Sequence, residues 1–229
     1  MKRESGDSPL PVRIRWRHVG RPQDVGQIVD GRWRLENGRL RTAQVGYDRI
    51  FLVGNRRWRD YEVRTSILVH AVAPPDEAFP YSGGHGVGLI LRFSGHTTGG
   101  PFAFASGQPK FGYLPLGGIA LLRWARGVPD RPPLMQFYSG DGVFRYGEFP
   151  VSSGMLLEVR GRCETLPDAS GGRSMTRYSF KAWRAGGNEP AEWSWQHVLT
   201  SGTALREGGL ALLAHHVDAS FGDLTITNP

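Results

Sequence analysis

Short runs of alternating apolar and polar residues, separated by glycine and proline, fill most of this sequence. The clearest run covers residues 61–70, where every second side chain is apolar or small and the residues between them, except Leu68, are polar. Such alternation is typical of a strand with one buried face and one solvated face. No window keeps the helical i, i+3, i+4, i+7 spacing over three turns, so only a turn or two of helix is expected, between Trp195 and Glu207. We therefore predict an all-β chain.

The composition supports one large β domain. The chain has 229 residues, of which 39% are hydrophobic, and it contains 32 Gly and 16 Pro, a mixture that suits many short strands joined by turns. We find no linker long enough to divide two domains, so one domain spanning residues 1–229 is expected, with residues 1–15 as a loosely attached arm. Asn37-Gly38 predicts a hairpin turn, and residues 167–174 predict a hairpin tip.

The distribution of charge indicates which classes of binding partner suit the chain. The formal net charge is +7, and Lys occurs only at positions 2, 110 and 181, so the other 25 basic residues are Arg. They are spread along the chain without a dense run or a recognised nucleic-acid motif, which disfavours nucleic acid as the partner. The same positive field permits an acidic polysaccharide.

The compartment stays open. The single Cys163 excludes an internal disulfide, which fits the cytoplasm and also a well-cored exported domain. The first residues are charged and have no apolar core, so no signal peptide is expected within this chain, and no stretch is long enough to span a bilayer. A secreted or periplasmic location is favoured if such a signal has been removed.

The segment 86–95, "GVGLILRFSG", has two unlike faces if it is a strand. One face carries Val87, Leu89, Leu91 and Phe93 and requires a core. The other face carries the remaining residues: Gly86, Gly88, Ile90 and Arg92. A face with two glycines beside one guanidinium predicts either the floor of a binding groove or relief of crowding next to an ion-paired Arg.

The order of several segments resembles the concanavalin A-like lectin/glucanase superfamily, in particular its laminin-G-like and 3-keto-disaccharide hydrolase domains. These segments are "DGRWRLENGRLRT", "NRRWRDYEVRTSI", "GVGLILRF", "GIALLRWARG", "LLEVRGR", "YSFKAWRAG" and "ASFGDLTIT". The resemblance covers residues 28–229. It implies an antiparallel jelly-roll sandwich of two sheets, which an all-β chain of this length also favours by itself, and a glycan bound on a concave face and its rim loops.

Candidate ligand-binding residues follow from this interpretation. Arg92 offers a planar fork that suits hydroxyls or a carboxylate. Trp124 shares a face with Ala120 and Leu122, so it is either a stacking platform or a core residue. Polar and aromatic side chains in or beside glycine-rich loops complete the set: His85, His96, Gln108, Lys110, Tyr113, Tyr138 and Tyr146. His215 and His216 are expected mid-strand with opposite orientations, one of them facing the groove.

An enzyme that degrades polysaccharide is the alternative function. The Glu-x-Asp-x-Glu pattern of glucanases with this fold is missing, since Asp60 and Glu62 are followed by Arg64. Nucleophile-elbow, Cys-x-x-Cys and His-Glu-x-x-His motifs are also missing from the sequence. A lyase acting on a uronic acid needs a cation or amide and a proton-transfer group, and Arg92, Gln108, His96 and Tyr113 are of the right types.

The resemblance also implies a structural calcium ion. Many relatives hold one on the convex side with a carboxylate near the final strand, and Asp223 stands at the matching place. Calcium needs several oxygen ligands, so further ligands are expected from residues 24–30 or from Glu36. The alternative role for Asp223 is a turn cap before the last strand.

Overall fold

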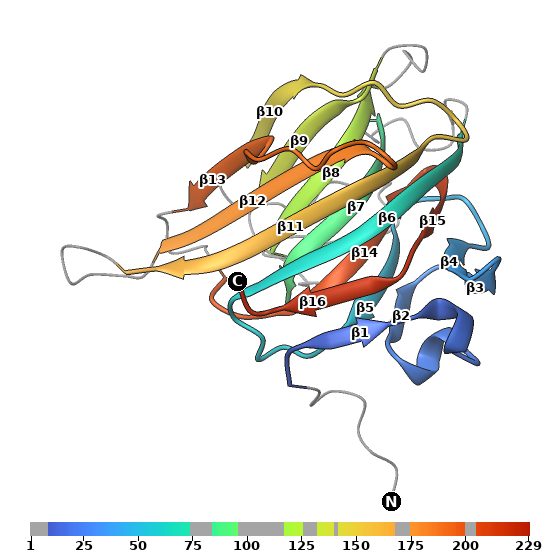
Figure 1. Cartoon of the computed structure of the whole chain (residues 1–229), viewed down its shortest axis with the longest axis horizontal. Coiled ribbons are helices and arrows are strands. Elements are labelled where there is room, and N and C mark those ends of the chain that lie inside the picture. Colours follow the sequence, from blue (N-terminus) through green and yellow to red (C-terminus); the bar gives the residue numbers. More distant parts are fainter. Residues whose placement is uncertain are drawn as a thin grey trace, which may run out of the picture.

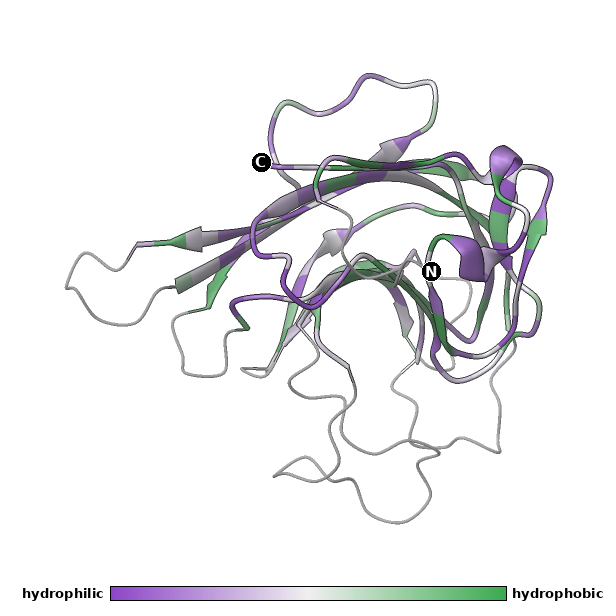
Figure 2. Ribbon diagram, turned by 90° about the horizontal axis from the view of Figure 1, so that it is seen from below, coloured by the Kyte–Doolittle hydropathy of each residue, from purple (hydrophilic) through white to green (hydrophobic). Residues whose placement is uncertain are grey.

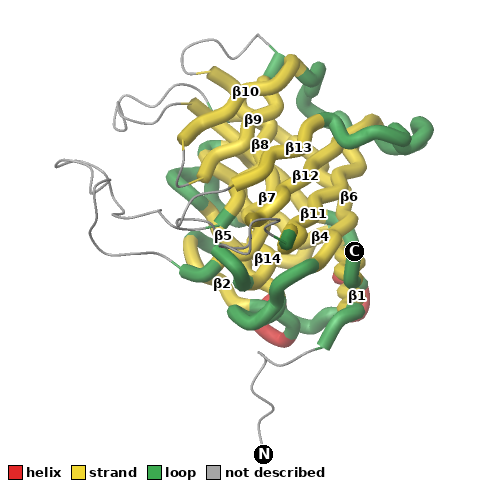
Figure 3. The backbone as a smooth tube through the Cα atoms, turned by 90° about the vertical axis from the view of Figure 1, so that its left-hand side faces the viewer, coloured by secondary structure: helices red, strands yellow, loops and turns green. Residues whose placement is uncertain are grey.

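The structure, a computed structural model, describes residues 9–73, 84–95, 117–125, 132–139, 142–167, 175–199 and 205–229. In these residues the chain forms two antiparallel β-sheets stacked face to face (Figure 1). Helix is confined, within the same residues, to the single turns η1 (Trp16–His18) and η2 (Pro22–Asp24), both between β1 and β2 (Figure 3). No helix in the described ranges has the length and apolar character needed to span a bilayer.

The two sheets differ in size. The nine-stranded sheet contains β1 (Val12–Ile14), β3 (Trp33–Glu36), β4 (Arg39–Thr42), β6 (Tyr61–Val72), β11 (Leu156–Leu166), β12 (Met175–Arg184), β13 (Trp195–Leu199), β15 (Val217–Phe221) and β16 (Leu224–Thr227). The seven-stranded sheet contains β2 (Gln27–Asp30), β5 (Arg49–Val53), β7 (Gly84–Phe93), β8 (Gly118–Ala125), β9 (Leu134–Ser139), β10 (Gly142–Glu148) and β14 (Gly209–His215). The predicted two-sheet β-sandwich is confirmed.

Both sheets are curved. The smaller sheet runs in the order β10-β9-β8-β7-β14-β5-β2. Seen edge-on, it is concave on the side that faces away from the larger sheet (Figure 2). We call this side the concave face.

The main core lies between the sheets. β6 shows how the sequence builds it, because Tyr61, Val63, Thr65 and Ile67 are buried while the residues between them are half-buried or exposed. The matching inner residues of β7 are Val87, Leu89 and Leu91. Alternating apolar side chains on both sheets therefore meet in one layer, as expected for aligned sheets.

The predicted hairpin turn at Asn37-Gly38 is confirmed. β3 pairs with β4 from Trp33↔Thr42 to Glu36↔Arg39. Asn37 and Gly38 connect them with φ of 52° and 69°. Positive φ at both central residues is what a two-residue hairpin loop requires, and Asn-Gly adopts it at low cost.

Two sequence expectations are wrong. Residues 195–199 are strand β13, paired with β12, rather than helix, because Trp195 and Leu199 are buried on the sheet and Gln196 and Val198 are exposed. That alternation has the period of a strand. The expected loose arm does not extend through residues 12–14, because β1 pairs with β16 and inserts the buried Ile14 into the core.

Charges of both signs cover the outer face of the larger sheet. Cross-strand pairing places Arg64, Arg160 and Lys181 side by side. Glu189, on the loop after β12, lies 2.7 Å from Lys181, 3.1 Å from Arg160 and 3.8 Å from Arg64. One carboxylate therefore offsets the repulsion of three neighbouring cations.

Candidate functional site

The concave face is built from the outward side chains of β7 and its neighbours. Gly88 pairs with Leu121 on β8 and with Leu213 on β14. These two leucines belong to a second apolar cluster, separate from the main core, together with Ile50, Ile90, Phe93, Ile119 and Ala211. Gly86 and Gly88 therefore lie on the face predicted for them.

The two glycines have different roles. A Cβ at Gly88 would lie 2.0 Å from the backbone oxygen of Ala120, so this glycine permits the close approach of β8. A Cβ at Gly86 would meet Cδ of Arg123 at 3.4 Å and Cδ1 of Leu121 at 3.5 Å, which are ordinary contacts with side chains. Gly86 therefore gives room to the Arg123 side chain, and Gly88 is a packing requirement.

Arg92 does not lie on the concave face, and that prediction is wrong. Its side chain is fully buried, and all five guanidinium N–H groups have acceptors. Nη2 donates to Oδ1 of Asp60 at 2.7 Å and to Oγ1 of Thr165 at 2.8 Å. The remaining bonds go from Nη1 to Oγ1 of Thr176 and the Leu205 carbonyl, both at 2.7 Å, and from Nε to the Arg59 carbonyl at 2.8 Å. Arg92 therefore links the two sheets through hydrogen bonds.

A β-bulge turns Arg92 inward. Its φ is 54°, and the pairing with β14 shifts register between Gly209 and Ala211. The extra residue reverses the facing of the strand beyond it, so Phe93 joins Ile90 in the outer apolar cluster instead of facing the main core. The phenol of Tyr61 bridges the bulge, since it accepts from the Arg92 backbone N–H at 2.7 Å and donates to the Gly209 carbonyl at 2.8 Å.

A polar cluster occupies one end of the concave face. Arg123 on β8 pairs with Gly86, and Gly86 pairs with His215 at the end of β14. Nδ1 of His215 is 2.7 Å from Oδ1 of Asp48, and the ring of Tyr47 lies 4.8 Å from that of His215. We call these residues, together with Tyr138, which pairs with Ile119 four residues farther along β8, the Arg123 cluster: Tyr47, Asp48, Arg123, Tyr138 and His215.

Burial perturbs the groups of the Arg123 cluster. Burial lowers the pKa of Arg123, against the opposing charges of Asp48, Tyr47 and Tyr138. Burial also raises the pKa of Tyr47, and the charge of Asp48 adds to the effect. The pKa of Tyr138 is raised by burial too, although Arg123 opposes this shift. Both phenols therefore stay protonated at neutral pH and can donate hydrogen bonds.

The histidines at this end are closer together than predicted. His216 has a φ of 55°, and its ring lies 4.5 Å from that of His215, so the two side chains do not point to opposite faces of one strand. His85 is buried between the sheets, with its ring 5.3 Å from that of His216. His215 is the one beside the concave face, as predicted for one of the pair.

The other predicted residues fall into three groups. Trp124 is buried in the main core with Ala120 and Leu122, so it is not a stacking platform. Tyr138 lies half-buried on the concave face, where it pairs with Ile119, and Tyr146 stacks on Trp195. The remaining candidates lie outside the described residues: His96, Gln108, Lys110 and Tyr113.

Three members of the cluster were missed in the sequence. Arg123 was interpreted only as part of the strand "ALLRWARG", although its alternation with Leu121 places it on the outward face. Tyr47 and Asp48 stand in a short segment before β5, where no periodicity applies. The strand order that brings Asp48 to His215 is a tertiary property, and sequence alternation carries no signal for it.

The surroundings of Asp223 do not fit a calcium site. Its Oδ1 accepts the Trp16 backbone N–H at 3.1 Å, and its charge acts on the nearby half-buried Arg39. The adjacent Gly222 carbonyl already accepts from Trp16 Nε1 at 2.7 Å. Nowhere in the described ranges do three or more His, Cys, Asp or Glu side chains gather closely enough to hold a metal ion. Asp223 instead joins β16 to the segment after β1.

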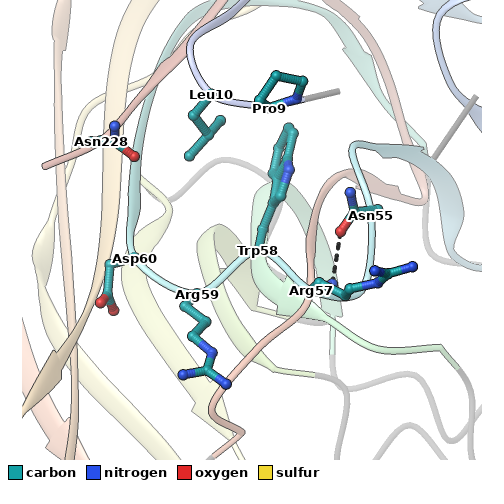
Figure 4. Close-up of a pocket in the computed structure, with 8 residues that line it drawn as sticks. All are labelled: Pro9, Leu10, Asn55, Arg57, Trp58, Arg59, Asp60 and Asn228. Carbon is teal, nitrogen blue, oxygen red and sulfur yellow. Dashed lines mark hydrogen bonds between the residues drawn. The ribbon is translucent and has the colours of Figure 1, made fainter. Parts of the chain in front are cut away.

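A hollow of about 500 Å³ lies at the opposite end of the sandwich, next to the start of β6 (Figure 4). Trp58 lines it but is only 6% exposed, so it offers no free ring face for stacking. Asp60 is bonded to Arg92, and Arg59 lies 3.7 Å from Glu207. The side chains that line this hollow already have structural partners, so the concave face is the better candidate.

Comparison with solved structures agrees with the fold. No protein-family model and no curated protein matches this sequence. A legume lectin-like domain from Entamoeba histolytica matches at a TM-score of 0.53 and 10% identity, over 91% of this chain and 92% of that one. The carbohydrate-binding module CBM66 from Bacillus subtilis matches at 0.51 and 12%, over 89% and 95%.

A third structure is the exoplasmic/lumenal domain of VIP36 in its Ca2+/Man2-bound form, with a TM-score of 0.51, 12% identity, and coverage of 94% and 86%. All three share the two-sheet architecture described above. The chain therefore has the concanavalin A-like lectin/glucanase jelly-roll fold, as its sequence predicted.

Proposed function

We propose that the chain binds carbohydrate on the concave face, at the Arg123 cluster. One observation carries the proposal: Arg123, a partly exposed cation, lies across the concave face over Gly86, with His215 on the next strand and Tyr47 packed against His215. A sugar ring needs an even surface beneath it and a few fixed polar groups around it. Tyr47, Tyr138 and Arg123 supply such groups from three separate strands or strand ends. The lectin and carbohydrate-binding relatives of the fold support the same assignment.

The positive charge of the chain extends the proposal to acidic polysaccharides. The net charge of +7 raises the local concentration of a polyanion whatever the contact residues are. It favours an acidic glycan over a neutral one of the same shape.

Glu148 and Asp48 are too far apart to act as a hydrolytic pair. Cross-strand pairing through Leu134, Arg123, Gly86 and His215 links Glu148 on β10 to Asp48 before β5. The two carboxylates are five strand spacings apart, or about 24 Å along the sheet. Glycoside hydrolysis needs a pair about 5 to 10 Å apart. The lyase alternative required Arg92 to bind the carboxylate of the substrate, but its side chain is buried and hydrogen-bonded between the two sheets.

We propose a structural calcium ion because of the fold class, and we do not propose Asp223 as its ligand. The Ca2+/Man2-bound form of the VIP36 domain supports a metal-dependent mode of sugar binding. Melting with and without EDTA tests it, since an ion that binds only the folded state raises stability.

The test of the function is a glycan array, followed by titration of the best glycan. Gly86→Trp should abolish binding, because its side chain must displace that of Arg123, whose Cδ already lies over this glycine. Tyr138→Ala should weaken binding. A wild-type chain that binds no glycan on the array would overturn the proposal, and an assay for unsaturated uronate products tests the lyase alternative.

A further inference from the structure

Arg123 is set into the concave face in an unusual way. Its neighbours across the strands are Gly86 and Leu134, so no bulky side chain stands directly beside it on the β7 side. Its aliphatic stem passes over Gly86, where Cδ would be 3.4 Å from an added Cβ. The side chain is partly exposed to solvent. The glycine therefore makes room for the arginine to lie across the face.

The guanidinium has no carboxylate partner among the described residues. Arg92, Arg41 and Arg49 each lie within 3.1 Å of a carboxylate oxygen. Asp48 is near Arg123, but its Oδ1 is 2.7 Å from Nδ1 of His215. Burial of an arginine without an ion pair is costly, and arginine cannot escape the cost by losing its proton. Such a group is well suited to a charge brought by a ligand.

The groups around Arg123 suit an anion attached to a sugar. Tyr138 lies on the same face opposite Ile119, and Tyr47 packs against His215; a phenol can donate a hydrogen bond to an anion or accept one from a hydroxyl. A guanidinium binds a carboxylate or sulfate through two parallel N–H bonds. The apolar cluster at Leu121 and Leu213 continues the same face and disfavours a ligand that is charged throughout.

We infer that Arg123 binds the anionic group, a carboxylate or a sulfate, of an acidic sugar residue. This inference rests on the proposed function and names the substrate class of the same site. Arg123, whose stem lies over Gly86, supplies the paired donors, and Tyr138 lies farther along the same face.

The experiment compares a uronic acid oligosaccharide, its carboxyl-reduced neutral form and a sulfated oligosaccharide, by calorimetric titration at fixed salt. Arg123→Gln should weaken binding of the preferred acidic ligand by about 10- to 100-fold, the range for a lost charged hydrogen bond, and leave the neutral form unchanged. The matched control is Arg13→Gln, which removes the same charge from an exposed position on β1, in the sheet that does not carry the concave face. It should change affinity less than about threefold.

The outcomes separate the two proposals. Preference for the carboxylate or for the sulfate identifies the source of the anion. Equal wild-type affinity for acidic and neutral forms, with no effect of Arg123→Gln, overturns the inference and leaves carbohydrate binding intact. Failure of every glycan to bind overturns the proposed function. Equal losses for the two Arg variants would show general charge attraction and also overturn the inference.

Discussion

Replacing Arg92 with methionine should be among the most destabilising single changes in this chain. Methionine keeps an unbranched apolar stem and removes all five donors. The carbonyls of Arg59 and Leu205 then lose a donor in the interior, and each such loss costs about 1 to 3 kcal/mol. Asp60 is 41% exposed and also accepts from Thr165, so it contributes less. We expect a total loss of about 3 to 5 kcal/mol, as for other broken buried pairs.

The measurement is urea unfolding with linear extrapolation to water. Arg145→Met, at an exposed site, is the control and should stay within about 0.5 kcal/mol of the wild type. Arg92→Lys should give an intermediate loss, because one ammonium group can reach only some of the five acceptors. A loss below about 1 kcal/mol for Arg92→Met would show that water replaces the guanidinium and that the Arg92 hydrogen bonds contribute little to the free energy of unfolding.

The remaining predictions concern the two glycines, the outer charges, the bulge and a metal. Gly88→Ala should destabilise by about 1 to 3 kcal/mol by forcing β8 away, and Gly86→Ala by less than about 1 kcal/mol; equal melting temperatures would contradict the distinction. Burial opposes ionisation of Glu189, but the Lys181 hydrogen bond and the charges of Arg160 and Arg64 lower its pKa overall. Its stabilisation is therefore complete above the unfolded pKa of about 4.3 and is lost as the pH falls through the lower folded pKa, so Glu189→Gln should destabilise at pH 7 and much less at pH 3. A pH-independent difference would refute this linkage. Tyr61→Phe should cost about 1 to 3 kcal/mol by leaving the Arg92 N–H and the Gly209 carbonyl without their bridge, as judged by the urea midpoint. EDTA should have the same effect on the melting temperatures of the wild type and an Asp223→Asn variant, because Asp223 accepts a hydrogen bond from a backbone N–H and does not bind a metal.

The sequence predicted the strands and their faces wherever the two-residue period is unbroken. In β7 the alternation is correct from Val87 to Leu91, and in β6 it is correct from Tyr61 to Val69. It fails at Arg92, where one extra residue reverses the faces. Arginine has no preference for the left-handed region, so its own identity gives no warning.

The residues that accompany the bulge at Arg92 are two glycines that are distant from it in the sequence. Gly117 and Gly208 both crowd against the Arg92 backbone, since an added Cβ would lie 2.2 Å from the Leu91 carbonyl in the first case and 2.3 Å from the Arg92 carbonyl in the second. Both also have positive φ. Their proximity to Arg92 depends on which strands become neighbours, and local alternation does not specify strand order. The Arg123 cluster escaped prediction for the same reason.

The antiparallel pairing of β1 with β16 fixes how this unit can be attached to something else. Val12 lies opposite Ile226 and Ile14 opposite Leu224, so the segments before β1 and after β16 leave from the same end of the sheet. Leu10 and Asn228 accordingly line one hollow (Figure 4). Both strands belong to the sheet that does not carry the concave face. A surface, a fusion partner or a host loop joined at either point would hold the unit from behind, and the face with Arg123 would remain turned toward the solution.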